Sequence, residues 1–327
     1  MKMNRPSFAR AAALSVALLV AGCAARPEPS RVLQFEFHSS FLLNLHHVLY
    51  DAARHPGKLD KLPWVQPPSA DEMAAMREAV AFYAANVAQR DLLFDDGLGA
   101  VKHALATADD AREDPRGLAL PPGLADALAR AAPVYARCLW DAQDAANRAW
   151  MARVSVLEAR YGAAIQPRLE RAFGRAFPPR IRDDVVVATG TFQGAYTDEP
   201  PPQTVIPSGR ADYDGPAALE MIWHEAAHAG PDDGLEQAIA DAAKAAHRKE
   251  PDGLWHAAHF YAVGVVVQDV LKADGVDYVQ YATKGGLYAR AWPQYLPLLQ
   301  SDWDAWVHGA GTQGDALRAM VAKLPAA

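Results

Sequence analysis

The segment His224-Glu225-Ala226-Ala227-His228 limits what this chain can fold into more than any other stretch. On an α-helix, residues four apart lie on the same face, so His224 and His228 can grip one metal ion between their imidazoles. Glu225 would then be within reach of a water held by that metal. The spacing follows metal chemistry rather than packing, and it predicts the core of a zinc-dependent hydrolytic site.

The surrounding residues predict that this segment lies on a helix that stops just after the second histidine. Asp214 is placed to cap the helix N-terminus, and Pro216 is tolerated in the first turn. Gly230 and Pro231 cannot continue the helix, so the chain is expected to turn and bring a later segment back to the site. The alternative is a surface helix with two incidental histidines. It is disfavoured by the apolar residues of this stretch: Met221, Ile222, Trp223, Ala226 and Ala227.

The first 23 residues have the pattern of an export signal. Basic residues precede an apolar run at 11–21, which is too short to span a bilayer as a mature helix. The run closes with Val20-Ala21-Gly22-Cys23, which resembles a bacterial lipobox at every position. The resemblance implies cleavage that removes residues 1–22 and a diacylglyceryl group on the sulfur of Cys23. An ordinary secretory signal with a coincidental cysteine is the alternative.

A lipid at Cys23 predicts a lipoprotein tethered to the bacterial cell envelope by residues 23–30. Ala24 stands where a retention aspartate would stand, so the resemblance implies the outer membrane, with the protein facing the periplasm. Several acyl chains anchor a protein to a membrane stably without a transmembrane helix. The formal net charge of −7 becomes three units more negative when the three basic residues of the signal are removed, which argues against a nucleic-acid partner.

Residues 31–177 are predicted to form an almost entirely helical region. Ser69-Ala70-Asp71-Glu72 matches a capping box and opens one helix, and a second, long helix is expected from Pro133 to near Gly162. The polar, proline-containing stretch 109–122 is read as a loop between them. Since Cys138 is the only cysteine besides the one assigned to lipid, no internal disulfide is expected, and Cys138 is predicted to be buried in a helix.

Residues 178–327 are predicted to contain a small sheet, the metal-binding helix and a C-terminal helical cap. The β-branched runs 185–189 and 204–208 are read as two strands. Pro207 cannot donate to a central ladder, so the second strand is expected at the edge of the sheet. An edge strand just before the metal-binding helix can hold an extended peptide by strand addition.

Strands, then an HExxH helix, then a second helix with the remaining ligand is an order that resembles the zincin metallopeptidases over residues 178–274. The resemblance implies a zinc-dependent peptidase. The metzincin branch is excluded, because its motif requires Gly and His where this chain has Pro231 and Gly234. The gluzincin branch takes a glutamate from a separate helix. Here Glu236 is too close to the motif and Glu250 falls in a loop, so no convincing ligand of that type is present.

The third zinc ligand is predicted on the helix that opens at Leu254. His256 shares a face with an inward-pointing apolar stripe, whereas His259 lies on a different face. His256 is therefore the preferred ligand and His259 the second candidate, and a core histidine satisfied by hydrogen bonds is the alternative for either. If neither binds, an acidic residue such as Glu236 or Asp269 takes that role. The pairing of HEAAH with this Trp-His helix also resembles uncharacterised zinc-peptidase lipoproteins of bacteria.

Other polar and aromatic residues are weaker candidates. Tyr261 and Tyr288 could donate to a tetrahedral oxyanion, although aromatic core packing is the commoner role. Four polar residues near the start of the helical region could line the cleft or hydrogen-bond within that region: His38, Asn44, His46 and His47. Three tryptophans are expected to pack the C-terminal cap: Trp292, Trp303 and Trp306.

These patterns predict an α+β, mostly helical protein with an N-terminal helical region followed by a zincin-like domain. His224, His228 and His256 would hold Zn²⁺ and leave the fourth position to water, with Glu225 as the general base for hydrolysis of a peptide or protein. The rival is a non-catalytic envelope lipoprotein that uses the same fold as a binding or scaffold module. A fourth protein ligand that closes the site would favour the rival, and hydrolysis of a non-peptide amide such as a cell-wall crosslink is a third hypothesis.

Overall fold

The computed structural model describes residues 32–190, 194–198 and 201–326. These residues belong to one compact unit, Arg31–Ala327. The predicted signal, the lipobox with Cys23 and the predicted tether lie outside the described residues. No helix among the residues that are described is both long and apolar enough to cross a membrane.

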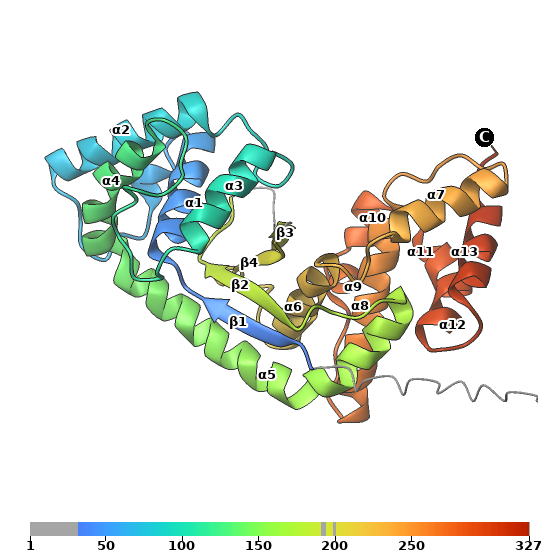
Figure 1. Cartoon of the computed structure of the whole chain (residues 1–327). Helices are drawn as coiled ribbons and strands as arrows, with labels where there is room; N and C mark the ends of the chain where they lie inside the picture. Colours follow the sequence, from blue (N-terminus) through green and yellow to red (C-terminus); the bar gives the residue numbers. More distant parts are fainter. Residues whose placement is uncertain (1–31, 191–193, 199–200, 327) are drawn as a thin grey trace, which may run out of the picture. The chain divides into compact units, whose positions relative to one another are not determined.

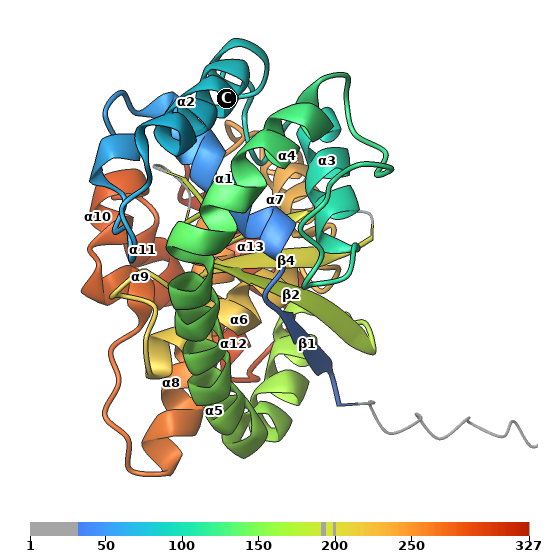
Figure 2. The same ribbon diagram turned by 90° about the vertical axis from the view of Figure 1, so that its left-hand side faces the viewer.

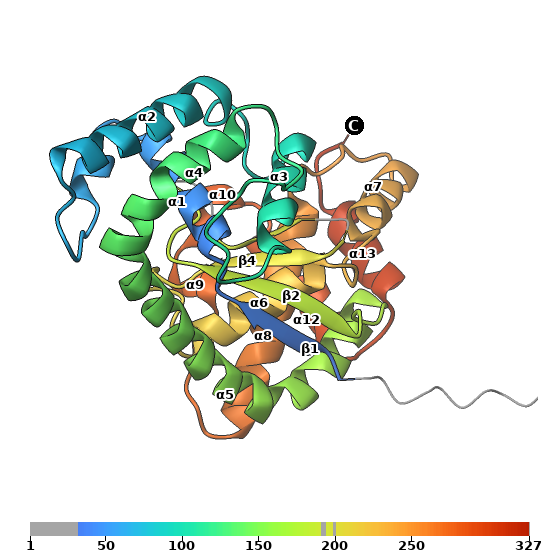
Figure 3. The same ribbon diagram turned by 60° about the vertical axis from the view of Figure 1, so that its left-hand side comes forward.

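The described part is mostly helical with one small sheet, which confirms the predicted α+β class. The sheet contains β1 (Gln34–His38), β2 (Arg180–Val186), β3 (Tyr196–Asp198) and β4 (Gln203–Pro207), in the order β1-β2-β4-β3. The β1–β2 and β2–β4 pairs are parallel, and β3 runs antiparallel to β4. Figure 3 shows β1, β2 and β4 side by side, with α6 behind them.

Two expectations about the sheet were wrong. The strand β4 is an inner strand, because the short β3, which was not predicted, pairs with the side of β4 that was expected to be the edge of the sheet. Pro207 is tolerated there because β3 pairs only with residues 203–205, and the following amide of Ser208 donates to Val186 of β2. The missing amide of Pro207 therefore points beyond the end of β3. The strand β1 lies in the region predicted to be helical.

The N-terminal helices are α1 (Phe41–Arg54), α2 (Ala70–Asn86), α3 (Asp96–Ala106) and α4 (Leu124–Tyr135). The predicted capping box at the start of α2 is present, with reciprocal hydrogen bonds between Ser69 and Glu72. The predicted loop over 109–122 contains no regular element, and Cys138 is buried as expected.

The long helix differs from its expected bounds at both ends. The helix α4 continues through a π-helical turn, η2 (Ala136–Trp140), into α5 (Asp141–Phe173), so Pro133 lies inside α4. Gly162 does not end α5, because it lies where a side chain would meet Glu158 and the ring of Trp223. A glycine there lets α5 pack closely against α6. The helix ends at Gly174, which has the left-handed φ of 77° that favours glycine.

The C-terminal half begins with the helix of the HExxH segment, α6 (Pro216–His228), followed by α7 (Leu235–Ala245) and α8 (Leu254–Ala273). Shorter elements complete the chain: α9 (Tyr281–Lys284), α10 (Leu287–Ala291), α11 (Leu296–Leu298), η3 (Leu299–Trp303), α12 (Asp304–Val307) and α13 (Gln313–Ala322). Figure 2 shows α5 passing along the sheet next to β1.

The sheet separates two hydrophobic cores. Strand residues alternate between its faces, so Val185 and Ile206 join the core of α5 to α8 and the C-terminal helices, whereas Val186 and Val205 join the core of α1 to α4. Figure 1 shows the sheet between these two groups of helices. The same alternation decides which strand residues face the HExxH helix.

Candidate metal centre

The helix α6 places both histidines of the HExxH segment at a buried end. Pro216 is its first residue, as predicted, but the N-cap is Gly215, while Asp214 forms an ion pair with Arg153. His228 is the last helical residue, and Gly230 follows with a φ of 121° that turns the chain away. The helix therefore starts and stops where the glycines and the proline require.

Three ring nitrogens from α6 and α8 face one another. The Nε2 atom of His224 lies 3.2 Å from Nε2 of His228 and 3.4 Å from Nε2 of His256. Two nitrogens bound at about 2.0–2.1 Å to a tetrahedral zinc lie about 3.3–3.4 Å apart. The two observed spacings match that value, so His224 could share a metal ion with His228 and with His256, although both spacings are also within hydrogen-bonding distance.

The protonation of these rings also suits metal binding. Burial, and then the neighbouring histidines, lower the pKa of both His224 and His256, which favours the neutral imidazole that a metal needs. Nδ1 of His228 lies 2.7 Å from the carboxylate of Asp232 and donates to it, which leaves a lone pair on Nε2. The Nδ1 atom of His224 is buried without a hydrogen-bond partner among the described residues.

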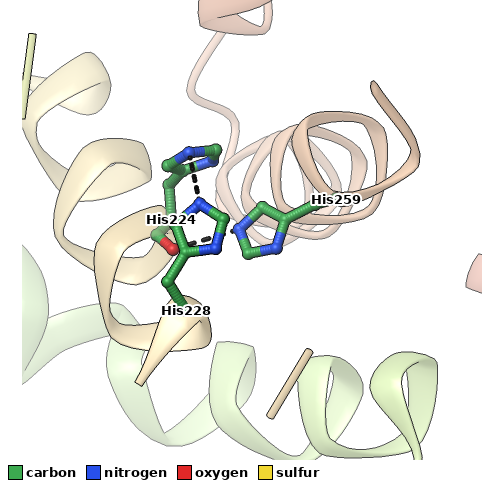
Figure 4. A group of neighbouring side chains, drawn as sticks. All are labelled: His224, His228 and His259. Carbon is green, nitrogen blue, oxygen red and sulfur yellow. Dashed lines mark hydrogen bonds between the residues drawn. The ribbon is translucent and has the colours of Figure 1, made fainter. Parts of the chain in front are cut away.

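His259 lies beside this group, but its ring has different hydrogen-bond partners. Ring nitrogens of His224, His228 and His259 lie within 4.8 Å of one another. However, Nδ1 of His259 lies 2.8 Å from Asp232 Oδ2. Its Nε2 lies 3.0 Å from the backbone oxygen of His224, a contact that Figure 4 shows. Both ring nitrogens of His259 thus face oxygen atoms of other groups, whereas Nε2 of His256 faces the ring of His224. The hydrogen-bond geometry therefore favours His256 over His259 as a third ligand.

Asp232 connects two of these histidines. Its Oδ2 atom accepts from Nδ1 of His228 and from Nδ1 of His259, whose rings stack with centroids 4.0 Å apart. Burial alone would raise the pKa of Asp232, but His259 and His228 hold it below its ordinary value. A carboxylate that fixes a histidine through its second nitrogen is the usual outer support of a metal site. Asp232 was not singled out from the sequence, although its position four residues after His228 is a signal that could have been used.

Glu225 points from α6 to the strand β3. Its Oε2 atom accepts a hydrogen bond of 2.8 Å from the hydroxyl of Thr197. The side chain is buried, with 4% of the residue exposed, and this burial raises the pKa of Glu225 to about 7. A carboxyl group with a pKa near neutrality is suited to taking up and releasing a proton.

Aromatic rings surround the three nitrogens. Trp255 stacks on His256 with centroids 4.9 Å apart, and Phe260 lies 3.9 Å from the ring of His224. Trp292, predicted to pack the C-terminal cap, instead contacts His256 at 5.4 Å. On α7 and the start of α8 lies a cavity of about 280 Å³, lined by Glu236, Ile239, Ala240, Glu250, Pro251, Asp252 and Trp255. Trp255 thus borders both the histidines and this cavity.

Several predicted residues lie elsewhere. The hydroxyl of Tyr261 donates to Asp304 on α12, and Tyr288 is buried with its hydroxyl unpartnered among the described residues, so neither is shown at the histidine cluster. Of the acidic alternatives, Asp269 pairs with His308, and Glu236 lines the cavity. Trp303 is fully buried, whereas Trp306 donates to the backbone of Ala172 as part of the expected C-terminal packing.

The polar residues near the start of the helical region make hydrogen bonds to partners other than the ring nitrogens of the three histidines. His38 pairs with Asp110, and the amide of Asn44 bonds to the backbone of β2. The fully buried rings of His46 and His47 bond to the hydroxyls of Tyr83 and Tyr196, respectively. These four residues therefore hydrogen-bond within the helical region and its contact with the sheet.

In comparisons with known proteins, no protein-family model, no curated protein and no solved structure matches the chain.

Proposed function

We propose that this protein is a zinc-dependent hydrolase with a zincin-like site, acting as a metallopeptidase. His224, His228 and His256 would hold Zn²⁺. The observation that carries the proposal is the convergence of their Nε2 atoms at spacings of 3.2 and 3.4 Å, one helical position from a buried glutamate. His259, by contrast, has both ring nitrogens against oxygen atoms, those of Asp232 and of the backbone of His224.

The chain's own residues suit hydrolysis of an amide bond. When bound, zinc would act as a Lewis acid and lower the pKa of a coordinated water. Glu225 would take the proton of the attacking water on Oε1 and then deliver it to the leaving amine. Asp232 would hold the ring of His228 in the tautomer that presents Nε2, and the rings of Trp255 and Phe260 would limit access of bulk water.

The sheet edge beside α6 supports a peptide as the substrate. The strand β3 pairs with β4 on one side only, and among the described residues no strand covers its other side. It also contacts Glu225 directly through Thr197. An extended peptide added at this edge would run past the general base. We therefore assign to β3 the role in peptide binding that was expected for β4 from the sequence.

The test is metal analysis and hydrolysis by the soluble form that lacks residues 1–23. We expect about one zinc per chain and cleavage of peptides in a mixed peptide library, read by mass spectrometry. Glu225→Gln keeps the three histidines, so zinc should stay bound while cleavage falls by about 10²- to 10⁴-fold, as expected for a lost general base.

Other outcomes would each reject part of the proposal. Retained cleavage in Glu225→Gln would reject Glu225 as the base, and loss of zinc in this variant would make Glu225 a ligand. A parent protein that binds zinc through a fourth side chain and cleaves no peptide would favour the scaffold function. Absence of any bound metal would reject the site itself.

A further inference from the structure

The three residues of β3 alternate between the two faces of the sheet. Tyr196 and Asp198 face the core of α1 to α4, whereas Thr197 faces α6. The hydroxyl of Thr197 lies 2.8 Å from Oε2 of Glu225 and 2.9 Å from the backbone oxygen of the same residue. One hydroxyl thus contacts both the side chain and the main chain of Glu225.

We propose that Thr197 is a positioning residue that fixes the orientation of the Glu225 carboxyl group beside the three histidines. This inference rests on the proposed function. A hydroxyl carries one donor hydrogen and also accepts. While Glu225 is ionised, Thr197 donates to Oε2. The backbone oxygen of Glu225, 2.9 Å away, also keeps the hydroxyl against α6, so that one oxygen of the carboxyl group is held in place.

The position of Thr197 is fixed from the opposite face of the sheet. The hydroxyl of Tyr196 lies 3.0 Å from Nε2 of the buried His47 on α1. The carboxylate of Asp198 lies 2.7 Å from the ammonium of Lys102 on α3, whose side chain is fully buried. Lys102 also lies 4.2 Å from the centre of the Tyr196 ring. A strand of three residues would otherwise be held only by its pairing with β4, so these contacts from α1 and α3 keep Thr197 against Glu225.

Substitution of Thr197 by Val and by Ser separates the hydroxyl from the shape of the side chain. Thr197→Val keeps the branched shape, which suits the strand, but removes the hydroxyl, whereas Thr197→Ser keeps the hydroxyl. With zinc content checked as equal, we expect kcat for a library peptide to fall roughly 10- to 100-fold in Thr197→Val with little change in KM. Thr197→Ser should restore kcat to near the parent value, which a purely structural role would not require.

A second readout does not depend on activity. The infrared bands of the Glu225 carboxyl group are obtained as the difference between the parent and Glu225→Gln. We expect these bands to shift in Thr197→Val, because a hydrogen bond is lost, and to return in Thr197→Ser.

Unshifted bands in Thr197→Val, or a kcat equal to that of the parent, would overturn the inference while leaving the proposed function standing. If neither the parent nor any variant cleaves peptides, the proposed function fails, and the infrared bands still decide whether Thr197 holds Glu225.

Discussion

At the scale of single residues, the two histidines of α8 have different roles although they lie only three positions apart. The ring of His256 presents Nε2 to His224, whereas the two ring nitrogens of His259 contact Asp232 and the backbone oxygen of His224. A ligand needs a lone pair, so hydrogen-bond partners decide the matter better than burial does. Burial alone would have chosen His259, which is completely inaccessible to solvent.

Zinc titration of two variants tests this division of roles. His256→Ala leaves two imidazoles, so zinc affinity should collapse. His259→Ala removes an outer partner of Asp232 and should weaken zinc binding by roughly 10- to 100-fold. Competition with a chelator gives both affinities, and circular dichroism confirms folding. If His256→Ala binds zinc like the parent and His259→Ala does not, the two roles must be exchanged.

Asp183 on β2 provides a second prediction at this scale. It is fully buried, and neither carboxyl oxygen has a hydrogen-bond partner among the described residues. Burial, followed by the charges of Asp184 and Glu225, raises the pKa of Asp183 well above its ordinary value. The folded state therefore keeps this proton at pH values where the unfolded state has lost it, so the group reduces stability as pH rises above about 4.

Asp183→Asn should remove that pH dependence. Relative to the parent, the free energy of unfolding of the variant should rise by up to about 1.4 kcal/mol per pH unit above about pH 4. Urea denaturation of the soluble form at pH 5 and at pH 8 measures the change. A constant difference between variant and parent at both pH values would show that Asp183 does not stay protonated in the folded protein.

At the scale of elements, the sequence was informative where the signals are local. The helix α6 follows from the four-residue spacing of its histidines, and its end follows from Gly230 directly after the motif. The start of α8 was predicted for the same reason, since Gly253 precedes Leu254 and provides the N-cap. Glycine and proline mark where a helix starts or ends, so these boundaries can be predicted without knowledge of the rest of the fold.

Elements that depend on distant partners were missed. The strand β1 pairs with β2 in a register that joins Gln34 to Arg180, and the alternation of Leu33, Phe35 and Phe37 with polar residues is a strand signal that was not used. The strand β3 has only three residues, and its existence decides that β4 is an inner strand. Gly162 continues α5 instead of ending it, and a side chain at this position would meet the carboxylate of Glu158. Thr197 was missed as a partner of Glu225 because β3 was missed.

The buried ion pair behind β3 gives a prediction at this scale. Lys102→Met leaves the carboxylate of Asp198 buried without its partner, so the free energy of unfolding should fall by about 3–5 kcal/mol. The matched control is Arg77→Met, which breaks an exposed pair with Asp60 and should cost less than about 1 kcal/mol. Urea denaturation measures both. Equal losses would show that the Lys102 pair does not brace the strand.

At the scale of the whole molecule, the sheet lies between two hydrophobic cores, and each core supports a different part of the candidate site. The core of α5 to α8 and the C-terminal helices holds the three histidines, and the core of α1 to α4 holds β3 from behind. The candidate site therefore needs both regions, although every proposed metal ligand comes from the second. Both regions belong to the same compact unit, Arg31–Ala327.

The last prediction concerns where this unit is placed in the cell. Val20-Ala21-Gly22-Cys23 predicts a lipid on the sulfur of Cys23, and we propose that this anchor holds the protein at the envelope. Cys23→Ser removes the acceptor atom, so the processed protein should leave the membrane fraction or its maturation should stall. Fractionation and intact-mass measurement compare the variant with the parent, and Cys138→Ser serves as the control because that thiol is buried. Membrane attachment and mass that do not change in Cys23→Ser would reject lipidation at this residue, and the site would then belong to a protein without this anchor.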